Sequence, residues 1–147
     1  MNSPDRPTIP ARLLIARHHW RQMRNHLAAQ APLEACGLLA GCLQRGELRS
    51  TAVFPVANSL ASPVRYRMEP TAQLAALNAI DDGGWQLAAI YHSHPLGPDF
   101  PSETDIREAS YPDAVYLIWS GRSGAWRCRG FSIQPGQVQR VRLLVQG

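Results

Sequence analysis

The sequence contains no long hydrophobic run. No apolar stretch approaches the roughly 20 residues that a membrane-spanning helix needs, and the N-terminal residues lack the apolar region of a signal peptide. Cysteine is also scarce: Cys36, Cys42 and Cys128 are an odd number without the spacing of a disulfide framework. We therefore expect reduced thiols and a cytoplasmic protein.

Charge is sparse too, with 18% charged residues against 45% hydrophobic residues. This balance is typical of a globular domain and excludes a disordered tail. The 147 residues suffice for one domain with a sizeable core, and no repeat, low-complexity tract or linker divides them. The net charge of +4 comes from arginines spread over several expected elements, which favours a solvated surface over a nucleic-acid interface. A mildly basic surface would speed encounter with acidic protein partners.

Prolines near the start indicate a loose arm at residues 1–11, so we expect the folded domain to occupy residues 12–147. Apolar residues spaced three and four apart predict helices, and short apolar runs bounded by turn residues predict strands. The expected helices span residues 18–30, 71–80 and 102–110. The expected strands span residues 13–15, 36–43, 48 to about 56, 64–68, 87–91, 115–119, 126–133 and 138–145. This mixture predicts an α/β domain with helices packed on a mixed β-sheet.

Two of the five histidines directly follow the most apolar expected strand, Leu87–Tyr91. Residues two apart on a strand point to the same side, so the imidazoles of His92 and His94 can converge beyond the strand end. The remaining histidines lie in or beside the first helix, match no ligand spacing and are expected on the surface. They are His18, His19 and His26.

A carboxylate can be returned to this histidine pair by the segment that follows it. Prolines and glycine between residues 95 and 101 force a loop, and Ser102 to Asp105 is typical of a helix start. Two imidazoles and a carboxylate suit zinc with an open fourth position. Taken singly, the histidines fit a hydrogen-bonded surface pair, and Ser102 with Asp105 fits a helix cap. Their joint occurrence favours the metal site.

These residues resemble a known motif. His92-Ser93-His94-Pro95, a six-residue loop and Ser102-Glu103-Thr104-Asp105 resemble His-x-His-Pro-x(6)-Ser-x-x-Asp of the JAMM (MPN+) zinc metallopeptidases. Upstream, Glu34-Ala35-Cys36-Gly37-Leu38-Leu39-Ala40-Gly41 resembles the compact bacterial branch of that family. The resemblance extends roughly from Leu13 to the C-terminus, and its specificity rests on these two segments.

The resemblance implies a single JAMM domain, similar in fold to cytidine deaminases. It implies one zinc ion per chain, with His92, His94 and Asp105 as ligands. Glu34 would be the general base that takes a proton from the attacking water, and Ser102 would donate to the oxyanion of the tetrahedral intermediate. We expect Asp99 and Glu103 to be surface acids, and Cys36 to be a small buried residue.

The resemblance also implies a reaction and a partner. Compact bacterial members hydrolyse the amide bond after a C-terminal Gly-Gly of ubiquitin-like sulfur-carrier proteins, and they release an amino acid such as cysteine or a short extension. The alternatives are a RadC-like DNA-associated protein and a non-catalytic MPN scaffold. Deaminase chemistry is disfavoured, because the chain lacks the Cys-x-x-Cys pair and the His/Cys-x-Glu signature of that site.

Overall fold

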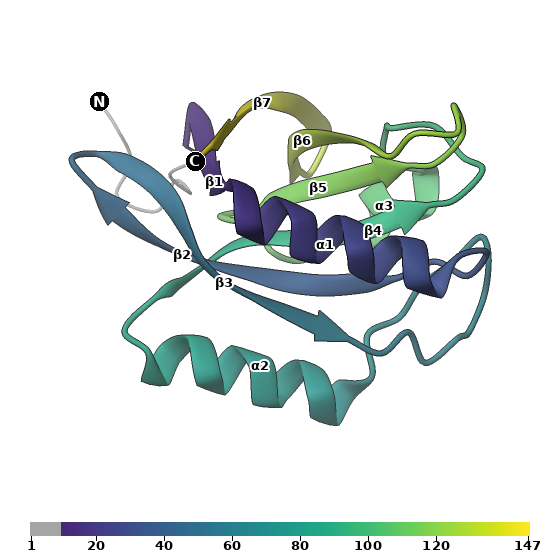
Figure 1. Cartoon of the computed structure of the whole chain (residues 1–147), viewed down its shortest axis with the longest axis horizontal. Coiled ribbons are helices and arrows are strands. Elements are labelled where there is room, and N and C mark those ends of the chain that lie inside the picture. The colour runs from purple at the N-terminus through teal and green to yellow at the C-terminus, as the bar shows by residue number, and fades with distance from the viewer. Residues whose placement is uncertain (1–9) are drawn as a thin grey trace.

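The computed structural model describes residues 10–147 (Figure 1). In chain order, its elements are β1 (Arg12–Ala16), α1 (Arg17–Gln30), β2 (Cys36–Gln44), β3 (Glu47–Val56), α2 (Pro70–Asp82), β4 (Gln86–His94), α3 (Glu103–Glu108), β5 (Val115–Ser120), β6 (Arg127–Gln134) and β7 (Gln137–Gln146). The arm expected at residues 1–11 lies almost entirely outside the described residues. The element bounds agree with the expected ones to within a few residues, with one exception below.

The described strands close into a barrel in the order β1-β3-β2-β4-β5-β6-β7. β1 pairs in parallel with β3 and β7, and β4 pairs in parallel with β5, whereas the other neighbours are antiparallel. The predicted α/β domain with helices on a mixed sheet is confirmed. Closure of the sheet was not predicted, because it depends on pairing between strands far apart in sequence.

Two helices cover the barrel (Figure 1). α1 buries Met23 against a core cluster that contains Leu117. α2 contributes Ala76 and Ile80 to a second cluster, which contains Ile118. Adjacent residues of β5 thus belong to different clusters, as the two-residue period of a strand requires. Burial on both faces explains why β4 and β5 are nearly continuously apolar.

The strand predicted at residues 64–68 is wrong. Within the described chain, this segment forms a single isolated bridge, between Asn58 and Met68. The amides of Leu60 and Arg67 donate to the Asn58 side chain, at 3.1 and 3.0 Å, so a side chain supplies acceptors that a strand neighbour would otherwise supply. Alternating apolar residues could not reveal this competition.

The expectation that the α1 histidines lie on the surface is also wrong in part. His18 is exposed, but His19 is only 6% exposed and His26 is half-buried. The Nδ1 atom of His19 lies 2.7 Å from the Ser50 hydroxyl, and that of His26 lies 2.8 Å from the Tyr91 phenol. These partners allow polar side chains on the packed face of α1.

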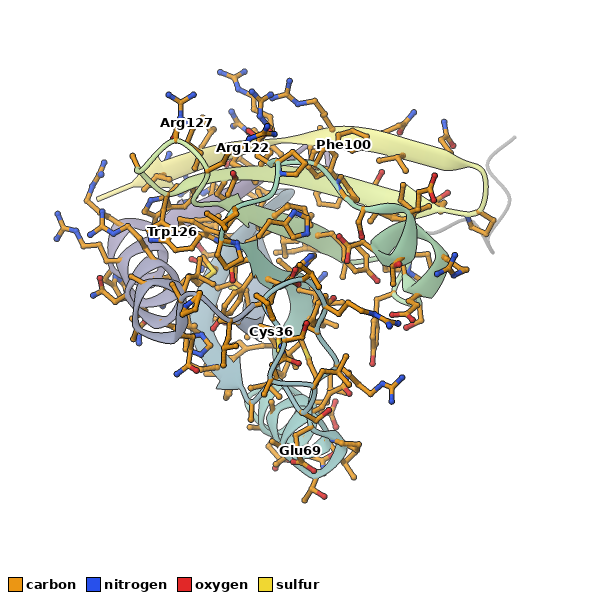
Figure 2. The ribbon with its side chains drawn as sticks, turned by 90° about the vertical axis from the view of Figure 1, so that its right-hand side faces the viewer. Cys36, Glu69, Phe100, Arg122, Trp126 and Arg127 are labelled. Atoms are coloured by element: carbon orange, nitrogen blue, oxygen red, sulfur yellow. The ribbon has the colours of Figure 1, made fainter. Side chains whose placement is uncertain are left out.

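Figure 2 labels Arg122 and Arg127, which are exposed, and Cys36, which is fully buried. Cys36, Cys42 and Cys128 are free thiols. Within residues 10–147, no helix is both long and apolar enough to cross a membrane.

Candidate metal centre

The end of β4 positions two imidazoles side by side. His92 pairs with Cys36 on β2 and with Ile118 on β5, so neighbouring strands flank its backbone on both sides. The side chains of His92 and His94 are buried, at 0% and 7% exposure of the residues. β4 therefore presents both rings from a rigid support.

The loop after β4 is anchored at the end of β5. The Ser120 hydroxyl donates to the Gly97 carbonyl at 2.6 Å, and the Gly121 amide donates to the His94 carbonyl at 3.1 Å. α3 then begins with a capping box, in which the Asp105 amide donates to the Ser102 hydroxyl and the Ser102 amide donates to Asp105 Oδ2. These contacts return Asp105 to the histidine pair.

Three ligand-type atoms converge at one point. The Nε2 atoms of His92 and His94 lie 3.1 Å apart, and Asp105 Oδ2 lies 3.1 Å from each of them. Tetrahedral zinc with bonds of about 2.0–2.1 Å separates neighbouring ligand atoms by about 3.3 Å. The spacing of the three atoms therefore fits a zinc ion.

The hydrogen bond on the far side of His94 also fits a metal ligand. Its Nδ1 lies 2.7 Å from the Pro98 carbonyl, which can only accept, so Nδ1 carries the proton and the neutral ring has its lone pair on Nε2. His92 Nδ1 is buried and has no hydrogen-bond partner among the described residues. The contact made by His92 Nε2 therefore determines which ring nitrogen of His92 carries the proton.

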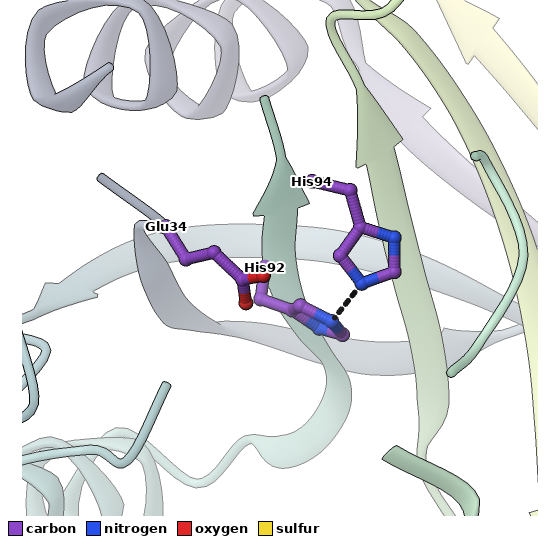
Figure 3. Close-up of side chains that lie close together, drawn as sticks. All are labelled: Glu34, His92 and His94. Carbon is purple, nitrogen blue, oxygen red and sulfur yellow. Dashed lines mark hydrogen bonds between the residues drawn. The ribbon is translucent and has the colours of Figure 1, made fainter. Parts of the chain in front are cut away.

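Glu34 lies beside this point of convergence (Figure 3). It precedes β2, is 5% exposed, and brings a carboxylate oxygen within 4.8 Å of ligand nitrogens of both His92 and His94. Glu34, His92 and His94 together form a candidate metal site by themselves. The structure therefore offers two carboxylates, Glu34 and Asp105, to one pair of imidazoles.

The two carboxylates have opposite pKa shifts. Burial raises the pKa of Glu34 to about 7, against the opposing effect of His94, with a smaller upward contribution from Asp105. Burial would also raise the pKa of Asp105, but its contacts with the imidazoles of His92 and His94 hold that pKa far below its usual range. Asp105 is thus the permanent anion, and Glu34 is the carboxylate that can exchange a proton near neutral pH.

Sequence reasoning missed two neighbours of the site. The Tyr66 ring stacks on His92, with centroids 4.3 Å apart and planes inclined by 27°. The Asn58 side-chain amide donates to the Glu34 carbonyl at 3.0 Å. Both residues lie in an irregular segment, and no local pattern distinguishes them from ordinary loop residues.

A cavity of about 250 Å³ lies beside Asp105 and Tyr66. Tyr66, Asp105, Ala109, Tyr111 and Tyr116 are among the residues that line it, so it runs from Asp105 towards the end of α3. Glu103, the first residue of α3, is exposed as expected, whereas Asp99 forms an ion pair with Arg129.

The fold and the site define a JAMM-type domain: a mixed barrel whose fourth strand ends in a histidine pair, with a returning aspartate and a buried glutamate beside it. Residues 16–129 match the family model of prokaryotic homologs of the JAB domain. The chain belongs to this family. JAB-domain proteins are in general zinc-dependent, and the chain carries a candidate metal site.

Several curated proteins are similar to this chain. The desampylase of Haloferax volcanii is 41% identical over 98 residues, which cover 66% of this chain and 69% of the desampylase. The probable TtuB-protein conjugate cleaving protease of Thermus thermophilus is 40% identical, over 85% of this chain and 78% of that protein. The CysO-cysteine peptidase of Mycobacterium tuberculosis is 38% identical, over 77% of each chain.

A solved structure confirms the fold. A protein from Desulfitobacterium hafniense superimposes with a TM-score of 0.81 at 30% sequence identity, covering 91% of this chain and 92% of the other. The predicted resemblance to the JAMM family, and to its branch acting on ubiquitin-like sulfur carriers, is confirmed by the family match and by the names of these relatives.

Proposed function

We propose that this protein is a zinc peptidase that hydrolyses the amide bond after the C-terminal Gly-Gly of a ubiquitin-like sulfur-carrier protein. The convergence of His92, His94 and Asp105 beside the buried Glu34 carries the proposal. The released group is an amino acid such as cysteine, or a short extension. The relatives named as proteases of TtuB conjugates and as CysO-cysteine peptidases support this reaction.

The pKa shifts support a division of roles between the two carboxylates. Asp105, whose pKa is held low, is assigned as the third zinc ligand with His92 and His94, one ion per chain. Glu34, whose pKa is raised to about 7, is assigned as the general base. Two carboxylates whose surroundings separate their pKa values commonly divide the work in this way.

Zinc, when bound, lowers the pKa of a coordinated water towards 7 and polarises the scissile carbonyl. Glu34 accepts a proton from the attacking water and passes it to the leaving amine. The Ser102 hydroxyl accepts a hydrogen bond from the Asp105 amide, which leaves its own proton available to donate to the oxyanion. Ser102 thus serves as helix cap and as oxyanion donor together.

The substrate tail is assigned to the cavity beside Asp105 and Tyr66. The irregular segment at residues 66–68 lines this cavity, and its Arg67 amide and carbonyl are already bonded to Asn58 and Ser59. A Cβ atom next to the scissile carbonyl would hold that carbonyl away from the metal. Glycine at both final positions removes this obstacle.

The alternatives fit the observations less well. A non-catalytic MPN scaffold does not need a converging His-His-Asp set beside a buried glutamate. The relatives are named as proteases, peptidases and deubiquitinases, which supports the peptidase over a RadC-like DNA-associated protein.

Free thiols at all three cysteines accord with a cytoplasmic location, and residues 12–147 are assigned as one catalytic domain.

Metal analysis and a cleavage assay test the proposal together. Purified protein should contain one zinc per chain, and a His92→Ala/His94→Ala double variant should contain none. The zinc protein should cleave a sulfur carrier extended beyond Gly-Gly, with the mass of the product ending at the second glycine. It should not cleave the matched carrier with Gly→Val at the final position. Stoichiometric zinc in the double variant, or equal cleavage of the valine tail, would contradict the proposal.

A further inference from the structure

The backbone of Glu34 is bound on both sides by one loop, residues 58–68, which we call the strap. The Glu34 amide donates to the Ser62 carbonyl at 2.8 Å, and the Glu34 carbonyl accepts from Asn58 Nδ2 at 3.0 Å. Glu34 lies outside β2, which begins at Cys36, so these two bonds hold a backbone segment that has no strand pairing. The position of Glu34 therefore depends on the strap.

The Asn58 side chain is the centre of the strap. Its Nδ2 donates to the carbonyls of Glu34 and Arg65, each at 3.0 Å. Its Oδ1 accepts from the amides of Leu60 and Arg67, at 3.1 and 3.0 Å. A side-chain amide has two donors and two acceptor positions, so all four are used. Such a complete network fixes the rotamer of Asn58 and the path of the loop.

The strap also contacts the candidate ligand set at a second place. Tyr66 stacks on His92 and lines the cavity assigned to the substrate tail. Outside the two ends of the strap, the Glu69 amide donates to the Ala57 carbonyl at 2.9 Å and closes its base. One loop therefore contacts both Glu34 and the face of a candidate zinc ligand.

We infer that Asn58 is a positioning residue for Glu34. Its amide fixes the Glu34 backbone, and through it the distance from the Glu34 carboxylate to the attacking water. The four hydrogen bonds of the Asn58 side chain all go to main-chain groups, so Asn58 acts on Glu34 through the backbone. A misplacement of about 1 Å at a reacting group costs about 10²-fold in rate. Loss of the hydrogen bond between Asn58 and Glu34 therefore matters even if the fold persists. This inference rests on the proposed function of Glu34 as general base.

Three variants of the zinc protein test the inference. Asn58→Ala removes all four hydrogen bonds. Asn58→Asp keeps the shape and the two acceptor positions that order the strap, but it removes both donors and so releases the Glu34 carbonyl. Ser59→Ala is the matched control, because it removes only the bond from Ser59 Oγ to the Arg67 carbonyl, at 3.0 Å, elsewhere in the strap. The added aspartate in Asn58→Asp can raise the pKa of Glu34, because like charges repel. Assays well above pH 7 keep Glu34 ionised in every variant.

Both Asn58 variants should lower kcat on an extended sulfur carrier by about 10- to 10²-fold, with KM within about twofold of wild type and one zinc per chain. Ser59→Ala should match wild type. A wild-type kcat for Asn58→Asp, a raised KM with unchanged kcat, or an equal loss in Ser59→Ala would overturn the inference.

Amide hydrogen exchange gives a second readout that needs no turnover. The Glu34 amide should exchange faster in both Asn58 variants and at the wild-type rate in Ser59→Ala. Unchanged exchange at Glu34 in both Asn58 variants would overturn the inference that Asn58 positions Glu34. If the wild-type protein cleaved no carrier while the exchange results appeared as expected, the proposed function would fail and the tie between Asn58 and Glu34 would stand.

Discussion

Glu34 and Asp105 are carboxylates that share one pair of imidazoles, yet their surroundings give them different protonation behaviour. Asp105 accepts hydrogen bonds at a helix start, where a negative charge is stabilised. Glu34 is buried, and desolvation by burial is the largest influence on its pKa. The same side-chain chemistry thus yields a permanent anion and a proton carrier.

Replacing Glu34 by Gln should separate metal binding from catalysis. The amide keeps the size of the side chain but cannot accept the proton of the attacking water, so kcat should fall by about 10²–10⁴-fold. Zinc content should stay at one per chain, because Asp105 is the assigned carboxylate ligand. Steady-state kinetics with metal analysis check both. Cleavage at nearly the wild-type rate would require another base.

Ser102→Ala tests whether the helix cap is also an oxyanion donor. Loss of the cap should lower the free energy of unfolding by about 0.5–2 kcal/mol. Loss of the donor should lower kcat by about 10²–10³-fold. Urea unfolding and kinetics on the same preparation measure the two effects separately. A stability loss with full activity would reduce Ser102 to a cap.

The candidate site divides into residues that the sequence can predict and residues that it cannot. His92, His94 and Asp105 are predictable, because a strand period and a helix-start signature determine where they point. Asn58 and Tyr66 are not, since their contacts depend on the path of an irregular loop through space. The identity of Glu34 as a site residue came from family resemblance, because a lone glutamate before a strand has no distinguishing pattern.

At the scale of elements, α1 attaches to the barrel through polar as well as apolar contacts. His19 bonds to Ser50 on β3, and His26 bonds to Tyr91 on β4. Desolvation by burial lowers the pKa of both histidines below 6.5. The helical spacing predicts which face of α1 packs against the barrel, but it does not predict which polar residues of the barrel contact that face.

These histidines should make the stability of the protein depend on pH. The pKa of His19 is lower in the folded chain than in the unfolded chain, so the unfolded chain takes up a proton at a higher pH. The contribution of His19 to the free energy of unfolding is therefore complete above about pH 6.5 and is lost as pH falls. Glu34, with its raised pKa, acts in the opposite direction, so the informative quantity is a difference between proteins. When the pH is lowered from 7.5 to 5.5, the melting temperature of His19→Gln should fall by less than that of the wild type. An equal or larger loss in His19→Gln would contradict this assignment.

At the scale of the whole molecule, short connections limit what the protein can hold. β2 ends at Gln44 and β3 begins at Glu47, and β5 ends at Ser120 with β6 beginning at Arg127. Neither turn has room for an insertion that could contact a second ubiquitin-like domain. We therefore predict that the chain acts on one folded carrier with an extended tail.

This compactness predicts selectivity between substrates. The zinc protein should cleave a sulfur carrier extended beyond Gly-Gly, and it should leave linked di-ubiquitin nearly intact under the same conditions. Mass spectrometry of both reactions, with Glu34→Gln as the inactive control, checks the comparison. A clear preference for di-ubiquitin would mean that a second ubiquitin is recognised by surfaces other than insertions.

The parallel pairing of β1 with β7 has a consequence for how the chain folds. Leu13 pairs with Leu143, so this contact joins residues about 130 positions apart. Such a closure must overcome nearly the largest loop entropy that the chain offers, and non-local pairing of this kind slows folding. Until it forms, β7 and the outer side of β1 are unpaired edges open to strands of other molecules. We therefore expect refolding from denaturant to be slow and its yield to fall as protein concentration rises.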